Sequence, residues 1–164
     1  MLTIAIALSG VIPAQARAGD DDGKPDSDTW ELEVGQIFGK TMVINAWDTI
    51  TFKNSSAEDY TVTFLVDGDP LPNEPASMIP TRQRGTYWDG TDVLNSGKIG
   101  KDGSYWVTIL EPGTYEFYNI LKPEQKGWVV AVPDTKHIPN EGTPVDQAAI
   151  DADPALKQLV EANQ

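Results

Sequence analysis

The residue types that most often do chemistry in proteins are scarce in this chain of 164 residues. The sequence has no cysteine and a single histidine, His137. These counts exclude disulfides, thiolate nucleophiles, iron–sulfur clusters, cysteine-ligated zinc or copper, and any site that needs two imidazoles. Glycine-rich nucleotide loops, nucleophile elbows and zinc-protease motifs are also missing from the sequence. We therefore expect a protein that is not an enzyme.

Carboxylates are abundant, and two pairs lie close enough in sequence for acid–base work: Asp67 with Asp69, and Asp89 with Asp92. Both pairs occur in glycine-containing stretches, where Asp commonly accepts hydrogen bonds from nearby backbone groups. We interpret them as turn residues. The run DDDGKPDSD at 20–28 fails the spacing of a calcium-binding loop and predicts a solvated acidic linker over residues 19–29.

The overall charge points to a basic rather than an acidic partner. Twenty-five acidic residues against 12 basic ones give a net charge of −13, which repels phosphate backbones and anionic lipid headgroups. We therefore expect no nucleic-acid partner and instead a protein partner or a membrane-protein complex. The candidate contact residues are aromatic or basic and lie in the loops, with burial in the core as the alternative for the aromatic ones; they are Arg82, Arg84, Tyr87, Trp88 and Lys122.

The elements that must position these residues are strands, because apolar and polar residues alternate with a period of two between residues 30 and 133. The predicted strands cover 30–34, 41–44, 49–53, 60–66, 104–110, 114–119 and 127–132. Seven short strands without helical periodicity between them indicate an all-β protein, a Greek-key β-sandwich over residues 30–133. Residues 67–100 are long and polar, so we expect them to cross between sheets and to carry surface loops.

Both ends of the chain differ from this pattern. Residues 1–18 contain an apolar run at 2–12 followed by AQARA, which is typical of a signal peptide or of an N-terminal hydrophobic segment kept as a peripheral membrane anchor. We therefore expect a periplasmic or extracellular protein. Residues 134–164 predict a linker and a C-terminal helix, with Asp153 as its N-cap and Pro154 at its first position.

Three segments resemble a known family in the same order along the chain. Residues 48–54 read DTITFKN, residues 93–97 read VLNSG, and residues 111–132 read EPGTYEFYNILKPEQKGWVVAV. Together they resemble the cupredoxins, the blue copper proteins that include plastocyanin and amicyanin, over the whole of residues 30–133. The resemblance implies a cupredoxin-like β-sandwich in which the loop at 120–126 corresponds to the copper-ligand loop.

The resemblance fails at the ligands themselves. The family's cysteine falls on Asn119, its two histidines on Tyr60 and Lys122, and its axial methionine on Gln125. A type 1 copper site needs two imidazoles and a thiolate, and of these four side chains only Gln125 offers a donor that some plant cupredoxins use. We expect no copper and no other cofactor.

Strand parity suggests what replaces the metal. Tyr115, Phe117 and Asn119 share one strand face, so the Asn119 amide and the Tyr60 phenol are expected to converge as a hydrogen-bonded polar plug, with Lys122 paired to Glu124 or in solvent. The alternative is that loop 120–126 is ordinary surface. Tyr115 after Pro-Gly-Thr also predicts a tyrosine corner.

These observations lead to two functional hypotheses from different classes. The first is an exported, metal-free cupredoxin-like binding or structural module, serving as an accessory subunit docked on a membrane-bound electron-transfer complex. The second is a plastocyanin- or amicyanin-like electron-transfer protein with a non-standard copper site. Stoichiometric copper in the purified protein would distinguish the second from the first.

Overall fold

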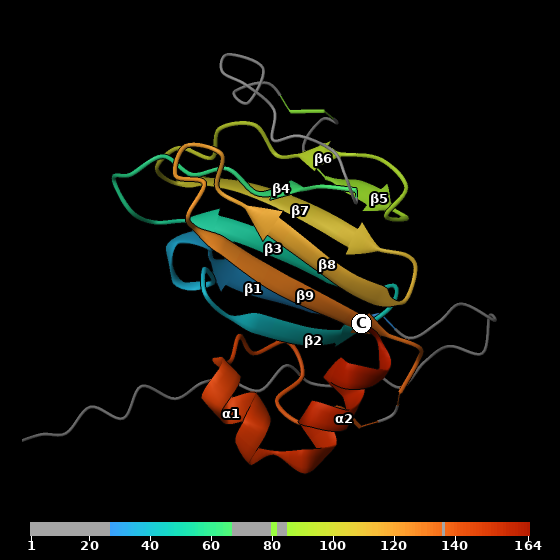
Figure 1. Ribbon diagram of the computed structural model, residues 1–164. Helices are drawn as coiled ribbons and strands as arrows, with labels where there is room; N and C mark the ends of the chain where they lie inside the picture. Colours follow the sequence, from blue (N-terminus) through green and yellow to red (C-terminus); the bar gives the residue numbers. More distant parts are fainter. Residues whose placement is uncertain (1–26, 67–79, 82–84, 136) are drawn as a thin grey trace, which may run out of the picture.

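Two β-sheets and two C-terminal helices make up the computed structural model, which describes residues 27–66, 80–81, 85–135 and 137–164 (Figure 1). The first sheet has the order β1 (Thr29–Glu33), β3 (Thr49–Asn54), β7 (Gly103–Ile109) and β5 (Thr86–Trp88). The second has the order β2 (Thr41–Asn45), β9 (Lys126–Val132), β8 (Gly113–Tyr118), β4 (Thr63–Phe64) and β6 (Leu94–Asn95). A short 3-10 helix, η1 (Val34–Gln36), follows β1.

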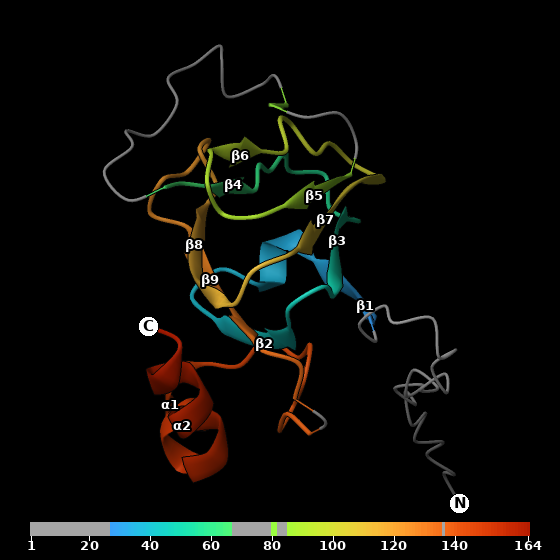
Figure 2. The same cartoon turned by 90° about the vertical axis from the view of Figure 1, so that its right-hand side faces the viewer.

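Alternation along the strands explains why the two sheets pack face to face. In β3, Ile50 and Phe52 are fully buried, whereas Thr49, Thr51 and Lys53 are partly exposed. Most neighbours within each sheet are not consecutive in the chain, and β1 runs parallel to β3 and β2 parallel to β9, as crossing connections require. The predicted all-β sandwich with a C-terminal helical extension is confirmed, and Figure 2 shows the two layers in cross-section.

The core between the sheets is rich in aromatic rings. Phe117 lies between Phe52 and Phe64, with ring centroids 5.9 and 5.5 Å away. Trp88 packs on Phe64 at 4.9 Å and is only 1% exposed. The prediction that Trp88 lies on a partner-binding surface is therefore wrong: β5 turns this side chain inward, and its indole N–H donates to the Asp92 carbonyl at 2.9 Å.

The long segment between β4 and β7 contains more structure than the sequence predicts. Its described residues include β5 and β6, whereas the strand predicted at 60–66 is reduced to Thr63–Phe64. The reason is that Tyr60 pairs with Ile99 in an isolated bridge and the Thr61 N–H donates to a side chain, so neither residue joins the ladder. Residues 67–79 and 82–84, which include Asp67, Asp69, Arg82 and Arg84, lie outside the described residues.

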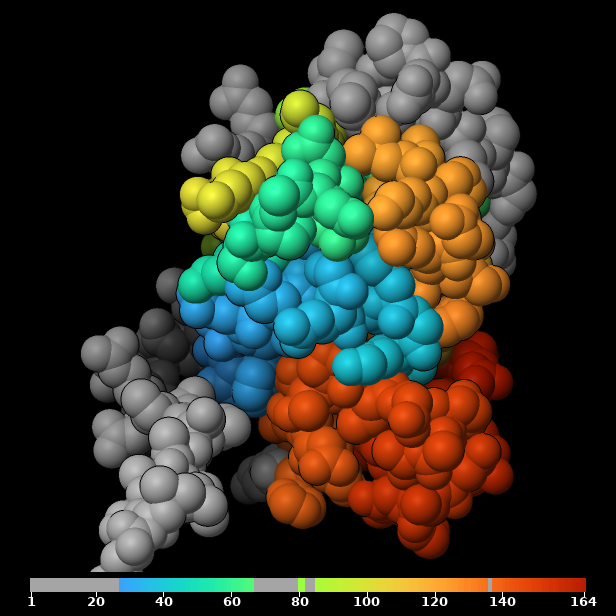
Figure 3. All heavy atoms as spheres, turned by 90° about the vertical axis from the view of Figure 1, so that its left-hand side faces the viewer, coloured from blue at the N-terminus to red at the C-terminus, as the bar shows by residue number. Residues whose placement is uncertain are grey.

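The C-terminal extension forms a second apolar layer on the outer face of β2 and β9. It contains α1 (Gln147–Ala152) and α2 (Pro154–Ala162), and the Asp153 carboxylate accepts from the N–H groups of Ala155 and Leu156, which confirms the predicted N-cap. The buried side chains of this layer are Val43, Val130, Val132, Ile138, Ile150, Leu156 and Val160. Figure 3 shows the extension, in orange and red, packed below the first strands. The sequence did not predict α1 as a separate helix.

The N-terminal predictions lie outside the described residues. The signal-peptide or anchor segment at 1–18, and the linker at 19–29 up to residue 26, belong to the part of the chain that the structure does not describe. Within the described ranges, no helix is long and apolar enough to cross a membrane.

Candidate functional site

Asn119 directly follows the last residue of β8 and begins the loop that leads into β9. Its side chain is fully buried, and both of its amide atoms have protein partners. The oxygen accepts from the Thr61 N–H at 3.2 Å, the Thr61 hydroxyl at 3.4 Å and the Leu121 N–H at 3.2 Å. The nitrogen donates to the Gln125 side-chain oxygen at 2.7 Å. Asn119 therefore holds two segments together that are 58 residues apart in the chain.

The backbone of residues 119–125 closes on itself around this side chain. The Asn119 N–H donates to the Gln125 carbonyl at 2.9 Å, and the Lys122 N–H donates to the Asn119 carbonyl at 2.9 Å. The Gln125 N–H donates to the Lys122 carbonyl at 2.8 Å, and the Ile120 N–H donates to the Thr61 hydroxyl at 2.7 Å. Internal hydrogen bonds thus fix the loop at residues 119–125, which the resemblance aligns with a copper-ligand loop.

A second polar group lies around Glu58. The Tyr60 hydroxyl donates to the Glu58 carboxylate at 3.3 Å, and the Lys122 ammonium donates to the same oxygen at 2.8 Å. The bond from Lys122 holds the pKa of Glu58 below its usual value, and Glu58 in turn raises the pKa of Lys122. Lys122 therefore pairs with Glu58, whereas the sequence predicts either a pair with Glu124 or a side chain in solvent. The difference arises because the loop turns the Lys122 side chain toward residues 58–60.

The structure brings the four positions that the resemblance aligns with copper ligands together in two pairs rather than in one group. Asn119 and Gln125 bond directly, whereas Tyr60 and Lys122 meet at a shared carboxylate. The sequence predicts that the Tyr60 phenol and the Asn119 amide converge directly. Instead, the backbone N–H of Thr61, the residue after Tyr60, donates to the Asn119 amide oxygen. Thr61 and Glu58 complete the two groups, and sequence reasoning missed both because Thr in a strand and Glu in a turn carry no distinctive pattern.

The residues present do not fit a type 1 copper ion. That ion requires a thiolate and two imidazoles, and this set supplies amides, hydroxyls, an ammonium and a carboxylate. Both atoms of the Asn119 amide are already engaged, and the Lys122 ammonium repels cations. His137 lies elsewhere, beside α2, in a cavity lined with Pro139 and Leu159. The described residues contain no group of three or more His, Cys, Asp or Glu side chains arranged to hold a metal.

A tyrosine corner fastens the opposite end of β8. The Tyr115 hydroxyl donates to the Glu111 carbonyl at 2.8 Å, which confirms the prediction. Burial raises the pKa of Tyr115, and the charges of Glu111 and Asp89 raise it further. Asp89 accepts from both the N–H and the hydroxyl of Thr91, as expected of a turn residue.

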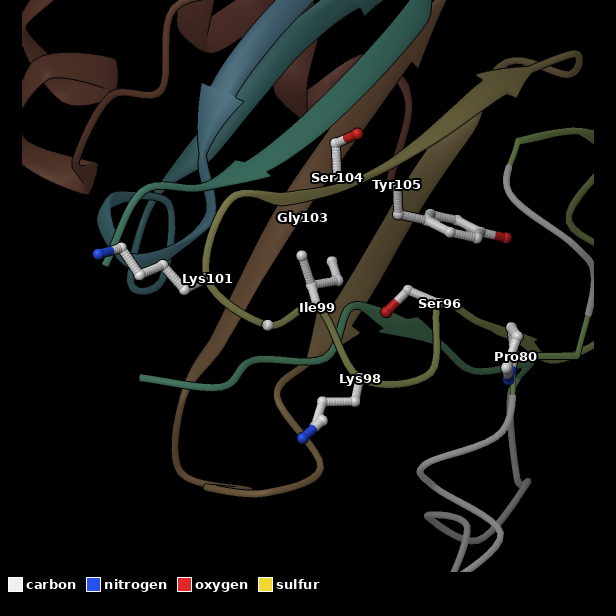
Figure 4. Close-up of a pocket in the computed structure, with 9 residues that line it drawn as sticks. Pro80, Ser96, Lys98, Ile99, Lys101, Gly103, Ser104 and Tyr105 are labelled. Carbon is white, nitrogen blue, oxygen red and sulfur yellow. The ribbon is translucent and has the colours of Figure 1, made fainter. Parts of the chain in front are cut away.

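A cavity of about 320 Å³ lies beside residues 96–105, and its two lysines suggest anion binding at first sight. Figure 4 shows that the side chains of Lys98 and Lys101 both extend away from the Tyr105 hydroxyl and that their ammonium ends do not meet. Lys98 is also paired with Asp59 at 3.1 Å. Because the two lysines among its described lining residues do not converge on it, this cavity is a poor candidate for an anion site.

The predicted contact residues are scattered. Tyr87 is 61% exposed and lies edge-on to Trp106, with ring centroids 6.1 Å apart. Trp88 is in the core, Lys122 is paired with Glu58, and the two arginines lie outside the described residues. These residues do not form one contiguous surface within the described part of the chain.

Comparisons with known proteins extend only to solved structures, since no protein-family model and no curated protein matches this chain. A mutant amicyanin in its Cu(I) form is 19% identical, with a TM-score of 0.46 over 63% of this chain and 82% of that chain. A reduced mutant amicyanin has a TM-score of 0.44 at 19% identity, covering 63% and 80%. An oxidized mutant amicyanin has a TM-score of 0.45 at 18% identity, covering 65% and 82%.

Proposed function

We propose that this chain is an exported, metal-free cupredoxin-like module that binds other proteins, an accessory subunit docked on a membrane-bound electron-transfer complex. The proposal that the module holds no metal is based on the hydrogen bonds of the Asn119 side chain. Its buried amide oxygen accepts from the Thr61 and Leu121 N–H groups, and its nitrogen donates to the Gln125 side-chain oxygen. The Asn119 oxygen, which would have to replace the thiolate, already serves as acceptor for these N–H groups.

The energetic argument concerns what an incoming copper ion would displace. To ligate copper, Asn119 would have to release the Thr61 and Leu121 N–H groups, and each buried N–H without a partner costs about 1–3 kcal/mol. An amide oxygen is also a poor substitute for a thiolate toward copper. The internal hydrogen bonds therefore compete successfully with the metal, and the loop keeps its shape without it.

Export and partner binding rest on the sequence. The apolar run at 2–12 followed by AQARA supports export, and the net charge of −13 supports a partner with a basic surface. The assignment to an electron-transfer complex follows from the usual company of the resembled fold, which is an analogy. We place no catalytic step in this module.

Copper binding by the natural chain, compared with a grafted site, tests the proposal. The graft carries Tyr60→His, Asn119→Cys and Lys122→His, which supplies two imidazoles and a thiolate and keeps Gln125 as the axial oxygen donor. Both proteins are loaded with Cu(II), desalted, and analysed for copper per chain and for visible absorption. We expect copper near zero and no colour in the natural chain, and copper with thiolate-to-metal absorption in the graft.

The possible outcomes separate the parts of the proposal. About one tightly held copper per natural chain would refute the metal-free reading and favour the electron-transfer alternative. Failure of the graft to bind copper would refute the cupredoxin-like geometry of the loop. Purification of the tagged chain from native membranes tests the accessory role, which is refuted if the chain is recovered only as a free monomer.

A further inference from the structure

The turn between β2 and β3 contains a residue that its backbone disfavours. Trp47 has a φ of 79°, in the left-handed region that glycine adopts readily and bulky residues rarely do. The other non-glycine residues with positive φ in the described ranges are Asp102 and Asn140, whose short polar side chains tolerate it. The Trp47 backbone is held in this turn by a hydrogen bond, in which its N–H donates to the Ile109 carbonyl at 2.6 Å.

The side chain of Trp47 is also exposed. Among the described residues, Trp47 and Tyr87 are the large hydrophobic side chains on the surface, with 43% and 61% of their area accessible. Trp47 thus combines an unfavourable backbone conformation with an apolar ring in water. A glycine or asparagine would form the same turn without either cost, so the turn itself does not explain the indole.

Exposed carboxylates and prolines lie at the same end of the sandwich. The turn is bonded to the last residues of β7 and β9, because the Ala46 N–H donates to the Val132 carbonyl at 2.8 Å and the Trp47 N–H to that of Ile109. Just beyond these two strand ends are four exposed residues: Glu111, Pro112, Pro133 and Asp134. None of the ion pairs found among the described residues involves these two carboxylates.

We propose that Trp47, with Glu111 and Asp134, forms a docking surface for an arginine- or lysine-bearing segment of a protein partner. A cation placed over the indole face gains a cation–π interaction, and the two carboxylates pair with neighbouring basic groups. The exposed prolines add rigid apolar area that loses little entropy on contact. The negative charge of the whole chain steers a basic partner toward it.

This inference deepens the proposed function, because it names the surface and the partner chemistry of a binding module. It lies at the other end of the sandwich from Asn119, since β8 runs from Gly113 to Tyr118 between the two sites, about 20 Å at the usual rise of a strand. In Figure 1 the β2–β3 turn and the β8–β9 loop lie at opposite ends. A failure here therefore leaves the copper measurements unaffected, and the reverse also holds.

Titration of the full chain with a defined basic peptide, followed by ¹⁵N NMR, tests the proposal. The probe is acetylated, amidated Arg-Leu-Arg-Leu-Arg, and the reversed-charge probe is Glu-Leu-Glu-Leu-Glu. We expect the basic peptide to shift the Trp47 indole N–H signal and the backbone signals of residues 110–113 and 133–135. The acidic peptide should leave these signals in place, and added salt should weaken the basic one.

Variants separate the indole and the carboxylates from general electrostatics. Trp47→Asn keeps a residue type that tolerates the left-handed backbone, and we expect it to weaken peptide binding at least tenfold without loss of the folded spectrum. Glu111→Gln with Asp134→Asn should weaken it about fivefold. Tyr87→Ser removes the other exposed ring and should have no effect. Shifts centred on Tyr87, shifts spread evenly over the acidic surface, no binding, or unchanged binding in Trp47→Asn would each overturn the proposal.

Discussion

Replacing Asn119 by alanine removes the side chain on which the 119–125 loop depends. The change leaves the Thr61 N–H without its acceptor at a fully buried position, and it also strips the Leu121 N–H and the Gln125 side-chain oxygen of partners in partly buried positions. A buried polar group left unpaired costs about 1–3 kcal/mol, and the partly buried ones cost less because water reaches them. We expect a total loss of about 3 kcal/mol in the free energy of unfolding.

Urea unfolding followed by tryptophan fluorescence measures this loss. For a protein with a stability of about 5–15 kcal/mol, the midpoint should fall clearly while the slope with urea stays constant. Gln158→Ala is the matched control, because it also removes an amide but from an exposed position on α2, and should change stability by less than about 0.5 kcal/mol. A loss below about 1 kcal/mol in Asn119→Ala would show that the loop does not depend on this amide.

Two further predictions concern the outer contacts of the sandwich. Asn45→Ala removes three hydrogen bonds to the C-terminal extension, two with the Thr135 backbone and one to Glu141. It should lower the free energy of unfolding by about 2 kcal/mol and speed amide hydrogen exchange in α2. Unchanged exchange would show that these bonds do not hold the extension in place. Glu116 accepts a hydrogen bond from the Tyr118 hydroxyl, which raises the pKa of Tyr118 to about 12. The contribution of this bond to the stability of the fold is therefore complete below about pH 10, and it is lost as the pH rises toward 12. Glu116→Gln should return that pKa toward 10 in an absorbance titration, and an unmoved titration would refute the assignment.

The sandwich and several of its local devices follow from local rules. Alternation in β3, the Pro-Gly-Thr-Tyr signal of the Tyr115 corner and the Asp153-Pro154 start of α2 each involve residues close in sequence, so a pattern suffices to find them. The position of Asn119 follows from strand parity and the family resemblance in the same way. These features depend on short-range geometry that each segment carries within itself.

Partners far apart in the chain explain what the sequence did not reveal. Lys122 has Glu124 two residues away, and only the fold shows that Glu58, 64 residues distant, is the carboxylate it reaches. The positive φ of Trp47 is equally invisible in the sequence, because a tryptophan predicts neither a left-handed turn nor exposure. The burial of Trp88 is not predicted either, because an aromatic residue after arginines suits a surface as well as a core.

The coupling within the Asn119 network also constrains how a copper site could be built into this loop. Asn119→Cys alone would remove an amide oxygen that serves three donors and install a thiolate without imidazole partners, so it combines the loss of hydrogen bonds with an incomplete site. A change at Lys122 or Tyr60 alone would supply a ligand position while the buried amide still occupies the centre. Each single substitution therefore either breaks hydrogen bonds of the network or leaves the ligand set incomplete, so a copper site in this loop would need all three changes together.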